Sequence, residues 1–408
     1  MGSPITLPWF GALDWRALEP FRQVLARRVR DREEWLVAVG VGGPFSTEPK
    51  IGEKVCVGYA GYDLKNQFEG LHSRHPEQDG FALSKWWSPR FWVHLKKERA
   101  VLHAAAEHEE EGLDFLKRLL ADPGPAPAMA PANWERTTTR ERYLQQVSAL
   151  LEHIQRGDIY EVNYCSQRTA HLPAFDCYTA FARLLDHSNA PFAAFLRDGY
   201  HVALCASPER FIRMERERLI SQPMKGTRPR GRSMAEDAAL VEELANDPKE
   251  RSENIMALDV ARNDLSRIAA PGSVQVEELC EVKSYMNVHQ LVSTVSARIR
   301  EGIAPMDILR ATFPMASMTG APKVRAMQLI DEVEDMRRGL FSGTIGFFLP
   351  DGTADLNVVI RTVTWDASTG RASLISGGAI TAGSTAMQEF EECEHKARTV
   401  LNAFGHGC

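Results

Sequence analysis

The order of strand-like and helix-like segments is the feature that most limits how this chain can fold. Strand-like runs come in groups, as at residues 191–207 and 209–222, and helical patterns stand between these groups. A regular alternation of one strand with one helix, which would indicate parallel βαβ units, is absent from the sequence. The pattern therefore predicts an α+β fold built on mixed β-sheets.

A proline- and alanine-rich stretch, ADPGPAPAMAPAN, interrupts these patterns at residues 121–133. Such a composition ends regular elements, because proline lacks a backbone donor and glycine favours turns. We therefore predict a connector at residues 121–136. Residues 1–120 are then an N-terminal supporting region, and residues 137–408 hold the candidate catalytic residues.

Capping residues and prolines mark where four helices begin. A side chain that accepts a backbone N–H in the first turn satisfies a donor that the helix itself leaves unpaired. The predicted starts are Thr138 with Glu141, Asp247 with Pro248 and Glu250, Pro322, and Thr385 with Gln388. Two turns are also predicted, at Gly199 and at Asp351-Gly352.

The charge balance and the cysteines limit the possible function classes. The 408 residues include 48 Lys and Arg against 54 Asp and Glu, and the formal charge of −6 is a poor match for nucleic acid. No apolar run approaches the roughly 18 residues of a membrane span, and no signal-peptide pattern opens the sequence. We therefore expect a cytoplasmic protein with no nucleic-acid or membrane partner. The seven cysteines form no C-x-x-C pair and are expected to be reduced and mostly packed.

Two pairs of glutamates stand at i,i+3 spacing on separate predicted helices, Glu250 with Glu253 and Glu389 with Glu392. This spacing projects two carboxylates from one helix face, and two facing pairs would suit Mg²⁺, which prefers oxygen ligands. A structural role explains part of the same pattern. Glu250 also suits a helix cap, and Glu392 stands four residues before Lys396, in the orientation that stabilises a helix.

Two basic residues differ from their surroundings. Lys225 follows a predicted strand and precedes Gly226, and a lysine in a dry pocket can lose its proton and act as a nucleophile. A solvated lysine in a turn is the alternative. Arg361 lies in the apolar strand pattern NVVIRTV, where it would bind an anionic ligand or pair with a buried carboxylate of the protein. Strand glycines that offer N–H groups to an anion, or that mark bulges, are Gly343, Gly346, Gly377 and Gly378.

Taken together, these segments resemble the chorismate-utilising enzymes. The matching stretches are GDIYEVNYCSQR, ASPERFI, PMKGTRPRG, DPKERSENIMALDVARNDLSRI, VHQLVSTV, FPMASMTGAPKVRAMQLIDEVE, RRGLFSGTIGFF, LNVVIRT and QEFEECEHKA. The likeness runs from about residue 137 to the C-terminus and is weaker before it, where GYAGYDLKN is the best stretch. It implies a fold of two mixed β-sheets stacked as a sandwich and flanked by outer helices.

The resemblance also implies a site for chorismate and Mg²⁺. Glu253 and Glu392 would be the nearest metal ligands, with Glu250 and Glu389 bridged to the ion by water. Arg361 would hold the enolpyruvyl carboxylate of the substrate. Further substrate contacts would come from Gly226, Thr227, Ser317, Gly346, Gly377 and Gly378.

Lys225 decides which branch of the family the chain resembles, because the branch that forms anthranilate usually has alanine at this position. The resemblance implies amination of chorismate at C4: neutral Lys225 attacks C2, the C4 hydroxyl leaves, and ammonia enters at C4 and expels the lysine. The product, 4-amino-4-deoxychorismate, would serve 4-aminobenzoate and folate synthesis. The mechanism needs a lysine whose pKa is lowered by burial.

Two positions depart from the family pattern. Gln290 stands where the family often has histidine and would hydrogen-bond the departing hydroxyl, and Phe347 replaces a common tyrosine. The sequence contains no G-x-C-x-G elbow of a glutaminase, so ammonia is expected from a separate glutaminase subunit. The alternatives are anthranilate formation, isochorismate or salicylate formation, and a chorismate-binding paralogue without catalytic activity.

Overall fold

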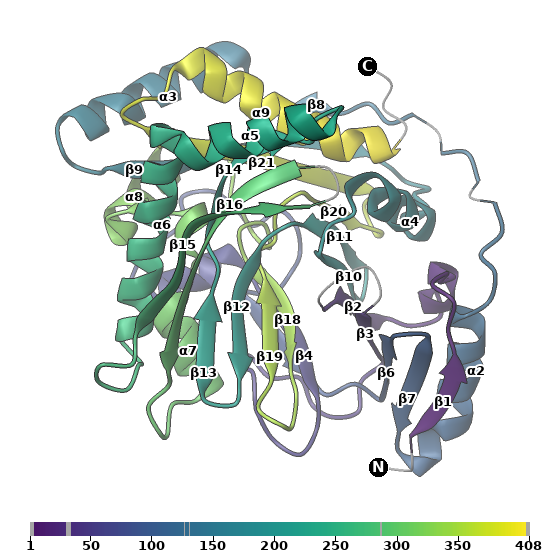
Figure 1. The fold of residues 1–408 in the computed structure, drawn as a ribbon. Helices are drawn as coiled ribbons and strands as arrows, with labels where there is room; N and C mark the ends of the chain where they lie inside the picture. Colours follow the sequence, from purple (N-terminus) through teal and green to yellow (C-terminus); the bar gives the residue numbers. More distant parts are fainter. Residues whose placement is uncertain (1–3, 30–33, 126, 130, 286–287, 405–408) are drawn as a thin grey trace.

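Two β-sheets form the centre of the molecule (Figure 1). The computed structural model describes residues 4–29, 34–125, 127–129, 131–285 and 288–404. In this part of the chain the first sheet has 12 strands and the second has nine. In order of pairing, the first sheet consists of β1 (Ile5–Pro8), β7 (Arg99–Ala104), β6 (Phe91–Lys96), β3 (Glu34–Val39), β2 (Gln23–Arg28), β10 (Phe192–Asp198), β11 (His201–Ser207), β20 (Thr362–Asp366), β21 (Arg371–Thr381), β9 (Glu161–His171) and β17 (Gly320–Ala321), with β8 (Glu135–Arg136) paired to β9.

The second sheet lies against the first. In order of pairing it consists of β14 (Met224–Pro229), β16 (Val288–Arg298), β13 (Arg218–Ser221), β12 (Arg210–Glu215), β19 (Ala354–Asn357), β18 (Thr344–Phe348), β4 (Cys56–Ala60) and β5 (Ser84–Trp87), with β15 (Gln275–Ser284) paired to β16. The α-helices are α1 (Lys65–Glu69), α2 (Glu109–Leu119), α3 (Arg140–Gln155), α4 (Cys177–Ser188), α5 (Met234–Asn246), α6 (Pro248–Ser266), α7 (Pro305–Thr312), α8 (Lys323–Val333) and α9 (Ala386–Leu401). Short 3₁₀ helices are η1 (Trp15–Leu18), η2 (Tyr62–Leu64), η3 (Ala106–His108), η4 (Ala316–Met318) and η5 (Asn402–Phe404).

The α+β class and the two sheets are confirmed, but the expectation of mixed strand directions is wrong. Every strand pair in the described ranges is antiparallel. Tight turns return the chain directly onto the preceding strand, at Gly199 between β10 and β11 and at Gly352 between β18 and β19, both with positive φ as predicted. Parallel neighbours would need long crossover connections instead of such turns.

The space between the two sheets is filled by apolar side chains. Leu25 and Leu196 of the first sheet belong to the same buried cluster as Tyr59 and Ile345 of the second. Burial of two facing apolar surfaces is what holds a sandwich together, because each sheet removes the other from water. The predicted sandwich core is therefore confirmed.

Helices cover the outer faces of both sheets, as predicted (Figure 1). Side chains of α2, α4 and α9 belong to the apolar cluster on the first sheet, and α6 and α7 belong to a cluster with strands of the second sheet. Helices α3, α8 and α9 pack against β9 and β21. This arrangement brings α6 and α9 to the same end of the sandwich, where β9, β14 and β21 also lie.

The predicted helix starts were accurate to within one residue, although Thr385 makes no side-chain hydrogen bond to the backbone of its helix. Asp247 is the N-cap of α6 and accepts hydrogen bonds from the N–H groups of Lys249 and Glu250, as predicted. The cap of α3 is Thr139, not Thr138, because the hydroxyl of Thr138 donates to Asp335 instead. The helices predicted at Pro322 and Thr385 begin one residue later, as α8 and α9, with those residues as N-caps.

The connector forms no helix or strand at residues 121–134 where the structure describes it, and β8 follows. Strands from before it join both sheets, since β2 pairs with β10 and β4 with β18. The division into a supporting and a catalytic region stays a prediction. In the described ranges no helix combines the length and apolar character of a membrane span. The cysteines found here are free and buried, as predicted, and Cys408 lies outside the described residues.

Candidate active site

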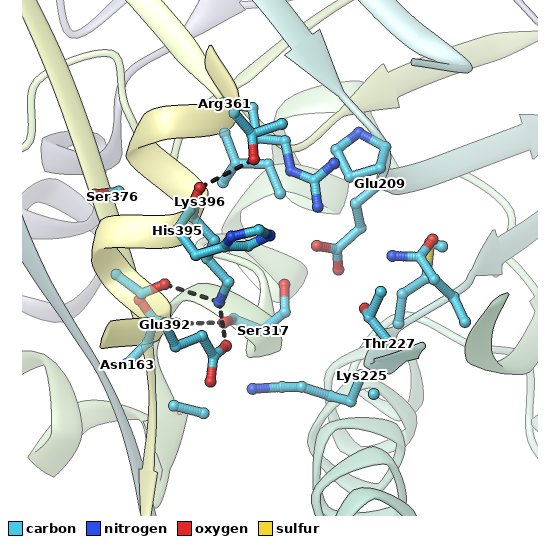
Figure 2. Close-up of a pocket in the computed structure, with 18 of the residues that line it drawn as sticks. Asn163, Glu209, Lys225, Thr227, Ser317, Arg361, Ser376, Glu392, His395 and Lys396 are labelled. Atoms are coloured by element: carbon cyan, nitrogen blue, oxygen red, sulfur yellow. Dashed lines mark hydrogen bonds and ion pairs between the residues drawn. The ribbon is translucent and has the colours of Figure 1, made fainter. Parts of the chain in front are cut away.

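A cavity of about 740 Å³ opens where β14 and β16 approach β21 and the helices α6 and α9 (Figure 2). All but three of the predicted site residues line it, and they come from segments that are far apart in the sequence. The lining residues are Lys225, Gly226, Thr227, Glu250, Glu253, Gln290, Ser317, Arg361, Gly377 and Glu392. The fold therefore gathers residues that spacing alone did not connect.

Gly346 is one of the three predicted residues outside the cavity lining. It pairs with Gly58 of β4 and Leu356 of β19, and a Cβ on it would lie 2.2 Å from the carbonyl oxygen of Asp355. Gly346 is therefore a glycine because the neighbouring strand leaves no room for a side chain, and the predicted substrate contact is not supported by its position. The neighbouring Phe347 is 1% exposed and lies between the two sheets, so the absent tyrosine hydroxyl does not concern the cavity.

Glu389 and Gly378 are the other two, and they lie directly behind the cavity wall. A Cβ on Gly378 would lie 3.1 Å from Oε2 of Glu389 and 3.8 Å from Oε1 of Glu392. Glu389 is 2% exposed, and its Oε1 accepts a hydrogen bond of 2.6 Å from Ser384. Gly378 therefore leaves room for the two carboxylates of α9. It does not line the cavity itself, so its predicted contact with the substrate is not supported.

Lys225 points from β14 into the cavity and meets a carboxylate that the sequence reasoning missed. Its Nζ donates to Oε1 of Glu161 on β9 at 2.6 Å, and the side chains of Lys225 and Glu161 are 10% and 5% exposed. Burial opposes the charge of Lys225, but Glu161, Glu253 and Glu209 outweigh it and raise the pKa above the ordinary value. The expectation of a lowered pKa is therefore wrong for this state: Lys225 is an ammonium ion held by a glutamate.

Gly226 shows why a glycine must follow this lysine. Its φ is +77°, a backbone conformation that side chains rarely adopt. A Cβ at this position would also lie 3.0 Å from Oε2 of Glu250, which belongs to α6. The glycine thus lets β14 pass close to the N-terminus of α6, so that Lys225 and the carboxylates of that helix share one cavity.

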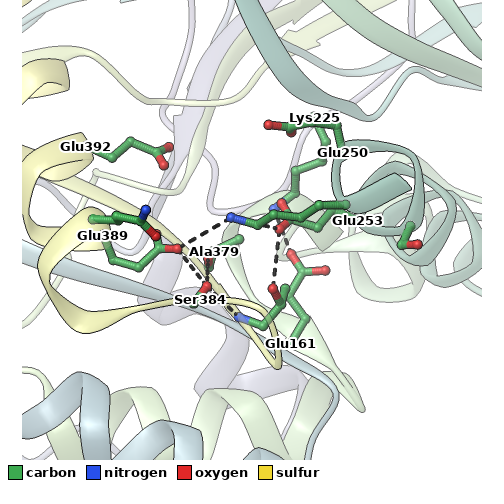
Figure 3. A network of polar contacts seen from close by, with 12 residues as sticks. Glu161, Lys225, Glu250, Glu253, Ala379, Ser384, Glu389 and Glu392 are labelled. Carbon is green, nitrogen blue, oxygen red and sulfur yellow. Dashed lines mark hydrogen bonds and ion pairs between the residues drawn. The ribbon is translucent and has the colours of Figure 1, made fainter. Parts of the chain in front are cut away.

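The two glutamate pairs approach each other from opposite sides (Figure 3). Glu250 and Glu253 come from α6, and Glu389 and Glu392 come from α9. Burial raises the pKa of Glu253 to about 7 and raises that of Glu389 above its ordinary value. Burial acts in the same direction on Glu392, but Lys396, at 2.7 Å, lowers its pKa. Two of the carboxylates are thus short of compensating positive charge.

These residues suit a hard divalent cation, although they do not form a closed cage. In the part of the chain that the structure describes, no group of three or more Asp, Glu, His or Cys side chains is close enough to hold a metal ion alone. Oε2 of the buried Glu389 nevertheless has no hydrogen-bond partner. Mg²⁺ commonly takes one or two carboxylates and completes its shell with waters and an anionic ligand. The donor set therefore matches Mg²⁺ bound together with a substrate.

Lys249 lies between the two glutamate pairs. Its Nζ is 3.9 Å from Oε1 of Glu253 and 3.8 Å from Oε1 of Glu389, and its side chain is 48% exposed. These separations are long for direct ion pairs and leave the lysine free to move outward. The position of Lys249 shows that the space between the helices is electrostatically favourable for a positive charge.

Arg361 lies where the chain passes from the second sheet to the first. The predicted continuous strand is wrong here: β19 ends at Asn357, β20 begins at Thr362, and Arg361 has a φ of +51°. Such a conformation is strained for arginine and persists at ligand sites when the surrounding structure enforces it. Among the described residues the guanidinium makes no ion pair, and Glu209 is the carboxylate whose charge acts on it. An anionic ligand is the partner that this geometry leaves open.

Glu209 is a second carboxylate that the sequence reasoning missed, although it stands in the quoted stretch ASPERFI. It is 6% exposed and lies between Arg361 and Lys225 in Figure 2. Burial raises its pKa to about 7, against the opposite effect of its neighbours Ser317, Lys225 and Arg361. Near neutral pH this carboxyl group therefore exists in both protonation states, as a proton donor in a cleft requires.

Gln290 faces the cavity, whereas the histidine beside it does not. Gln290 is 7% exposed on β16 and stands opposite Thr227 of β14. His289 is fully buried, with Nδ1 at 2.8 Å from Ser284 and Nε2 at 2.9 Å from Asp237. The alternation of side chains along a strand explains the opposite directions. His289 therefore cannot replace the family histidine, and Gln290 is the polar group at that point of the wall.

Comparison with known proteins gives consistent matches. The family model described as chorismate binding enzyme matches residues 18–402. The chain is 40% identical over 361 residues to an aminodeoxychorismate synthase of Streptomyces griseus, covering 85% of this chain and 49% of that protein, so it spans about half of that relative's length. It is 36% identical over 356 residues to an anthranilate synthase component 1 of Thermus thermophilus, covering 85% and 76% of the two chains. The solved structure of anthranilate synthase component I from Streptococcus pneumoniae shares the fold, with a TM-score of 0.76 at 23% identity over 98% of this chain and 93% of that one.

Proposed function

The chain belongs to the family of chorismate-binding enzymes, and from this premise we propose that it aminates chorismate at C4 with ammonia, giving 4-amino-4-deoxychorismate. The protein is then an aminodeoxychorismate synthase component I, and the Streptomyces griseus relative is named aminodeoxychorismate synthase. One observation carries the proposal: an inward-facing lysine, Lys225, shares a cavity with Arg361, which makes no ion pair among the described residues, and with three of the four paired glutamates. A lysine nucleophile, an anion-binding group and oxygen ligands are what this reaction requires.

Arg361 supports the binding of substrate at one end of the cavity. Chorismate has two carboxylates, and a guanidinium holds a carboxylate by two parallel hydrogen bonds. Burial lowers the pKa of Arg361, and Glu209 offsets this only in part, so the guanidinium would gain from an anionic partner. Thr227, Gln290 and Ser317 line the same cavity and would contact the ring and its hydroxyl.

The first chemical step joins Lys225 to the ring. The amine nitrogen of Lys225 forms a bond with C2, the two ring double bonds shift, and the C4–O bond breaks. Glu209 donates a proton to the departing hydroxyl, which leaves as water. Its pKa of about 7 provides a protonated fraction for this task at neutral pH.

The second step brings in ammonia. Its nitrogen forms a bond with C4, the double bonds shift back, and the bond between C2 and Lys225 breaks. The lysine thus acts as a temporary leaving group that holds the ring in an activated form. Gln290, which faces the cavity, would orient the C4 hydroxyl before departure and the incoming nitrogen afterwards.

Mg²⁺ is proposed as the cofactor. Glu253 and Glu392 would hold it, with Glu250 and Glu389 as second carboxylates bridged by water. When bound, it supplies positive charge that offsets the negative charge of these glutamates and of a substrate carboxylate. The unpartnered Oε2 of Glu389 supports this assignment.

Ammonia would come from a separate glutaminase subunit. The names of relatives with a numbered component, such as the anthranilate synthase component 1 of Thermus thermophilus, are in keeping with a two-component enzyme. Free ammonium salts would replace the partner in the test tube. The product would enter 4-aminobenzoate and folate synthesis, and the expected cytoplasmic location stays a prediction.

The test is a product analysis with chorismate, Mg²⁺ and ammonium, with and without an added aminodeoxychorismate lyase. We expect 4-aminobenzoate only when the lyase is present. Anthranilate formed without the lyase would show that the chain belongs to the anthranilate branch and would overturn the proposal. Chorismate that binds without any turnover, under conditions where a known synthase is active, would instead identify a non-catalytic paralogue.

A further inference from the structure

We propose that Glu161 is the base that takes the proton from Lys225 and so frees its amine to attack the substrate. This inference rests on the proposed amination through Lys225 and adds a catalytic residue to it. Glu161 is the first residue of β9, and its backbone pairs with Ala321 of β17 on one side and Thr381 of β21 on the other. Strands on both sides fix the carboxylate beside Nζ of Lys225.

The contact between the two side chains has the geometry of a proton transfer. Nζ of Lys225 lies 2.6 Å from Oε1 of Glu161, a short charge-assisted hydrogen bond (Figure 3). Among the described residues, Glu161 is the one carboxylate within ion-pair distance of Nζ. Both side chains are almost removed from water, so bulk water has little access to this proton.

A base is required because Lys225 is charged in the resting state. An ammonium ion has no free electron pair and cannot form a bond with C2. Carboxylates face it from several elements: Glu161 on β9, Glu253 on α6, Glu392 on α9, and Glu209 after β11. Together they hold the proton on Lys225, against the effect of burial. The enzyme therefore needs an acceptor in contact with Nζ, and Glu161 is in that position.

The proposed step balances in protons and electrons. The N–H bond of Lys225 breaks and an O–H bond forms on Glu161, leaving a neutral amine whose electron pair makes the bond to C2. When ammonia later displaces the lysine, the bond between C2 and nitrogen breaks and the amine leaves neutral. Glu161 then returns its proton, and the ion pair is restored. The proton that Glu209 gives to the departing water is replaced by the one that ammonium releases on forming ammonia.

Glu161→Gln is the direct test, because it keeps the size of the side chain and removes the base. We expect ammonia-dependent amination to fall by about 100-fold or more, the usual effect of removing a proton-transfer group. Labelling of Lys225 by acetic anhydride, followed by mass spectrometry over a range of pH, gives a second readout. Loss of the neighbouring charge should move its labelling midpoint down by about 1–3 pH units. Lys225 should thus become more reactive toward the reagent while the enzyme becomes slower.

The pH dependence of the variant separates a base from a merely structural partner. Without Glu161, solvent must take the proton from Lys225. The ratio of the variant rate to the wild-type rate should therefore rise as the pH approaches the midpoint of Lys225 labelling in the variant. Taking the ratio cancels the contribution of Glu209, which is common to both proteins. Glu161→Asp keeps a base and should retain more activity than Glu161→Gln. It also serves as the second variant if Glu161→Gln does not fold.

The matched control uses a similar ion pair outside the cavity. Nζ of Lys323 lies 2.5 Å from Asp264, with side chains 13% and 9% exposed. Asp264→Asn should change the labelling of Lys323 and leave that of Lys225 and the amination rate unchanged.

Two outcomes would overturn the inference. One is a Glu161→Gln enzyme with wild-type amination. The other is a slow enzyme whose rate ratio does not change with pH. A wild-type chain that forms no 4-amino-4-deoxychorismate would overturn the proposed function instead, so the two failures are distinguishable.

Discussion

Two nearly buried ion pairs in this molecule look alike in charge and differ in their surroundings. In the core, Arg338 pairs with Glu334, and both side chains are 1% exposed. The guanidinium also donates to the carbonyl oxygens of Met318 and Asn163 and to the hydroxyl of Ser342. Its N–H groups are therefore hydrogen-bonded within the protein. In the cavity wall, by contrast, Lys225 has one described partner, Glu161.

The difference separates a structural ion pair from a reactive one. A buried charge is tolerated when hydrogen bonds satisfy all of its polar atoms. The core pair meets this condition and has no group left for a ligand. The ammonium of Lys225 has three N–H donors, of which the described residues accept one, and its side chain faces a cavity. Residual hydrogen-bonding capacity, more than burial or charge, therefore marks the pair that can do chemistry.

The largest expected effect is the loss of amination in Lys225→Ala. Removal of the proposed covalent nucleophile should lower the rate by about 1,000-fold or more, because the other lysines of the cavity lining, Lys249 and Lys396, contact the glutamates of α6 and α9 instead. Product formation with ammonium and Mg²⁺ measures the rate, and thermal melting should show a folded protein. Lys283→Ala, which removes an exposed lysine of β15, is the control with unchanged rate. Full activity of Lys225→Ala would show that the Lys225–Glu161 ion pair is not the reactive one.

The next effect concerns the core pair and is on stability. Arg338→Met leaves Glu334 buried without its partner, and breaking a buried pair in this way costs about 3–5 kcal/mol. Urea unfolding should show this loss, whereas Lys225→Met, which also removes one cation, should cost less because Lys225 makes one described hydrogen bond and Arg338 makes five. Equal losses in the two variants would contradict the distinction drawn between the pairs.

A smaller effect should appear in the pH dependence of turnover. The proposed acid, Glu209, would act in its protonated form, and burial raises its pKa to about 7, so the protonated fraction falls as the pH rises above 7. The rate with saturating ammonia should therefore fall up to about tenfold per pH unit on the alkaline side. Glu209→Gln should be slow with no such fall. A wild-type rate that stays constant from pH 7 to pH 9 would exclude Glu209 as the acid.

The smallest effect is expected for Lys249→Met, which tests the lysine between the glutamate pairs. If this ammonium competes with Mg²⁺ for the carboxylates, its removal should tighten Mg²⁺ binding a few-fold, in line with the small worth of an exposed ion pair. Calorimetric titration with Mg²⁺ measures the affinity without turnover. Lys283→Met is the matched control, and weaker binding by Lys249→Met would show that the lysine supports the site.

Local features of the fold could be predicted from the sequence, because they depend on neighbouring residues. Asp247 caps α6 because its carboxylate, the proline after it and Glu250 all act within one helical turn. The break at Arg361 could not be predicted in the same way. The stretch NVVIRTV has the apolar pattern of one strand, and only the packing of two sheets requires the chain to leave one and enter the other there.

The candidate site shows the same limit. Lys225, Arg361 and the four glutamates stood out in the sequence, and the resemblance to the chorismate-utilising enzymes assigned them roles in the site. Glu161 and Glu209 were missed because each stands alone at the edge of a strand pattern. The partner of Glu161 is 64 residues further along the chain. The state of Lys225 was therefore predicted wrongly, since the carboxylate that sets its pKa is supplied by tertiary structure.

The pairing of β9 with β21 has a consequence for the way this protein is made. It joins His171 to Arg371 and Glu161 to Thr381, segments that leave the ribosome some 200 residues apart. Until β21 has been synthesised, the strand that presents Glu161 lacks the neighbour that buries it, and contacts so distant in sequence are slow to form. Helix α9 with its two glutamates follows later still. The proposed site should therefore form only after α9 has been synthesised, so that a nascent or truncated chain that lacks α9 should be inactive.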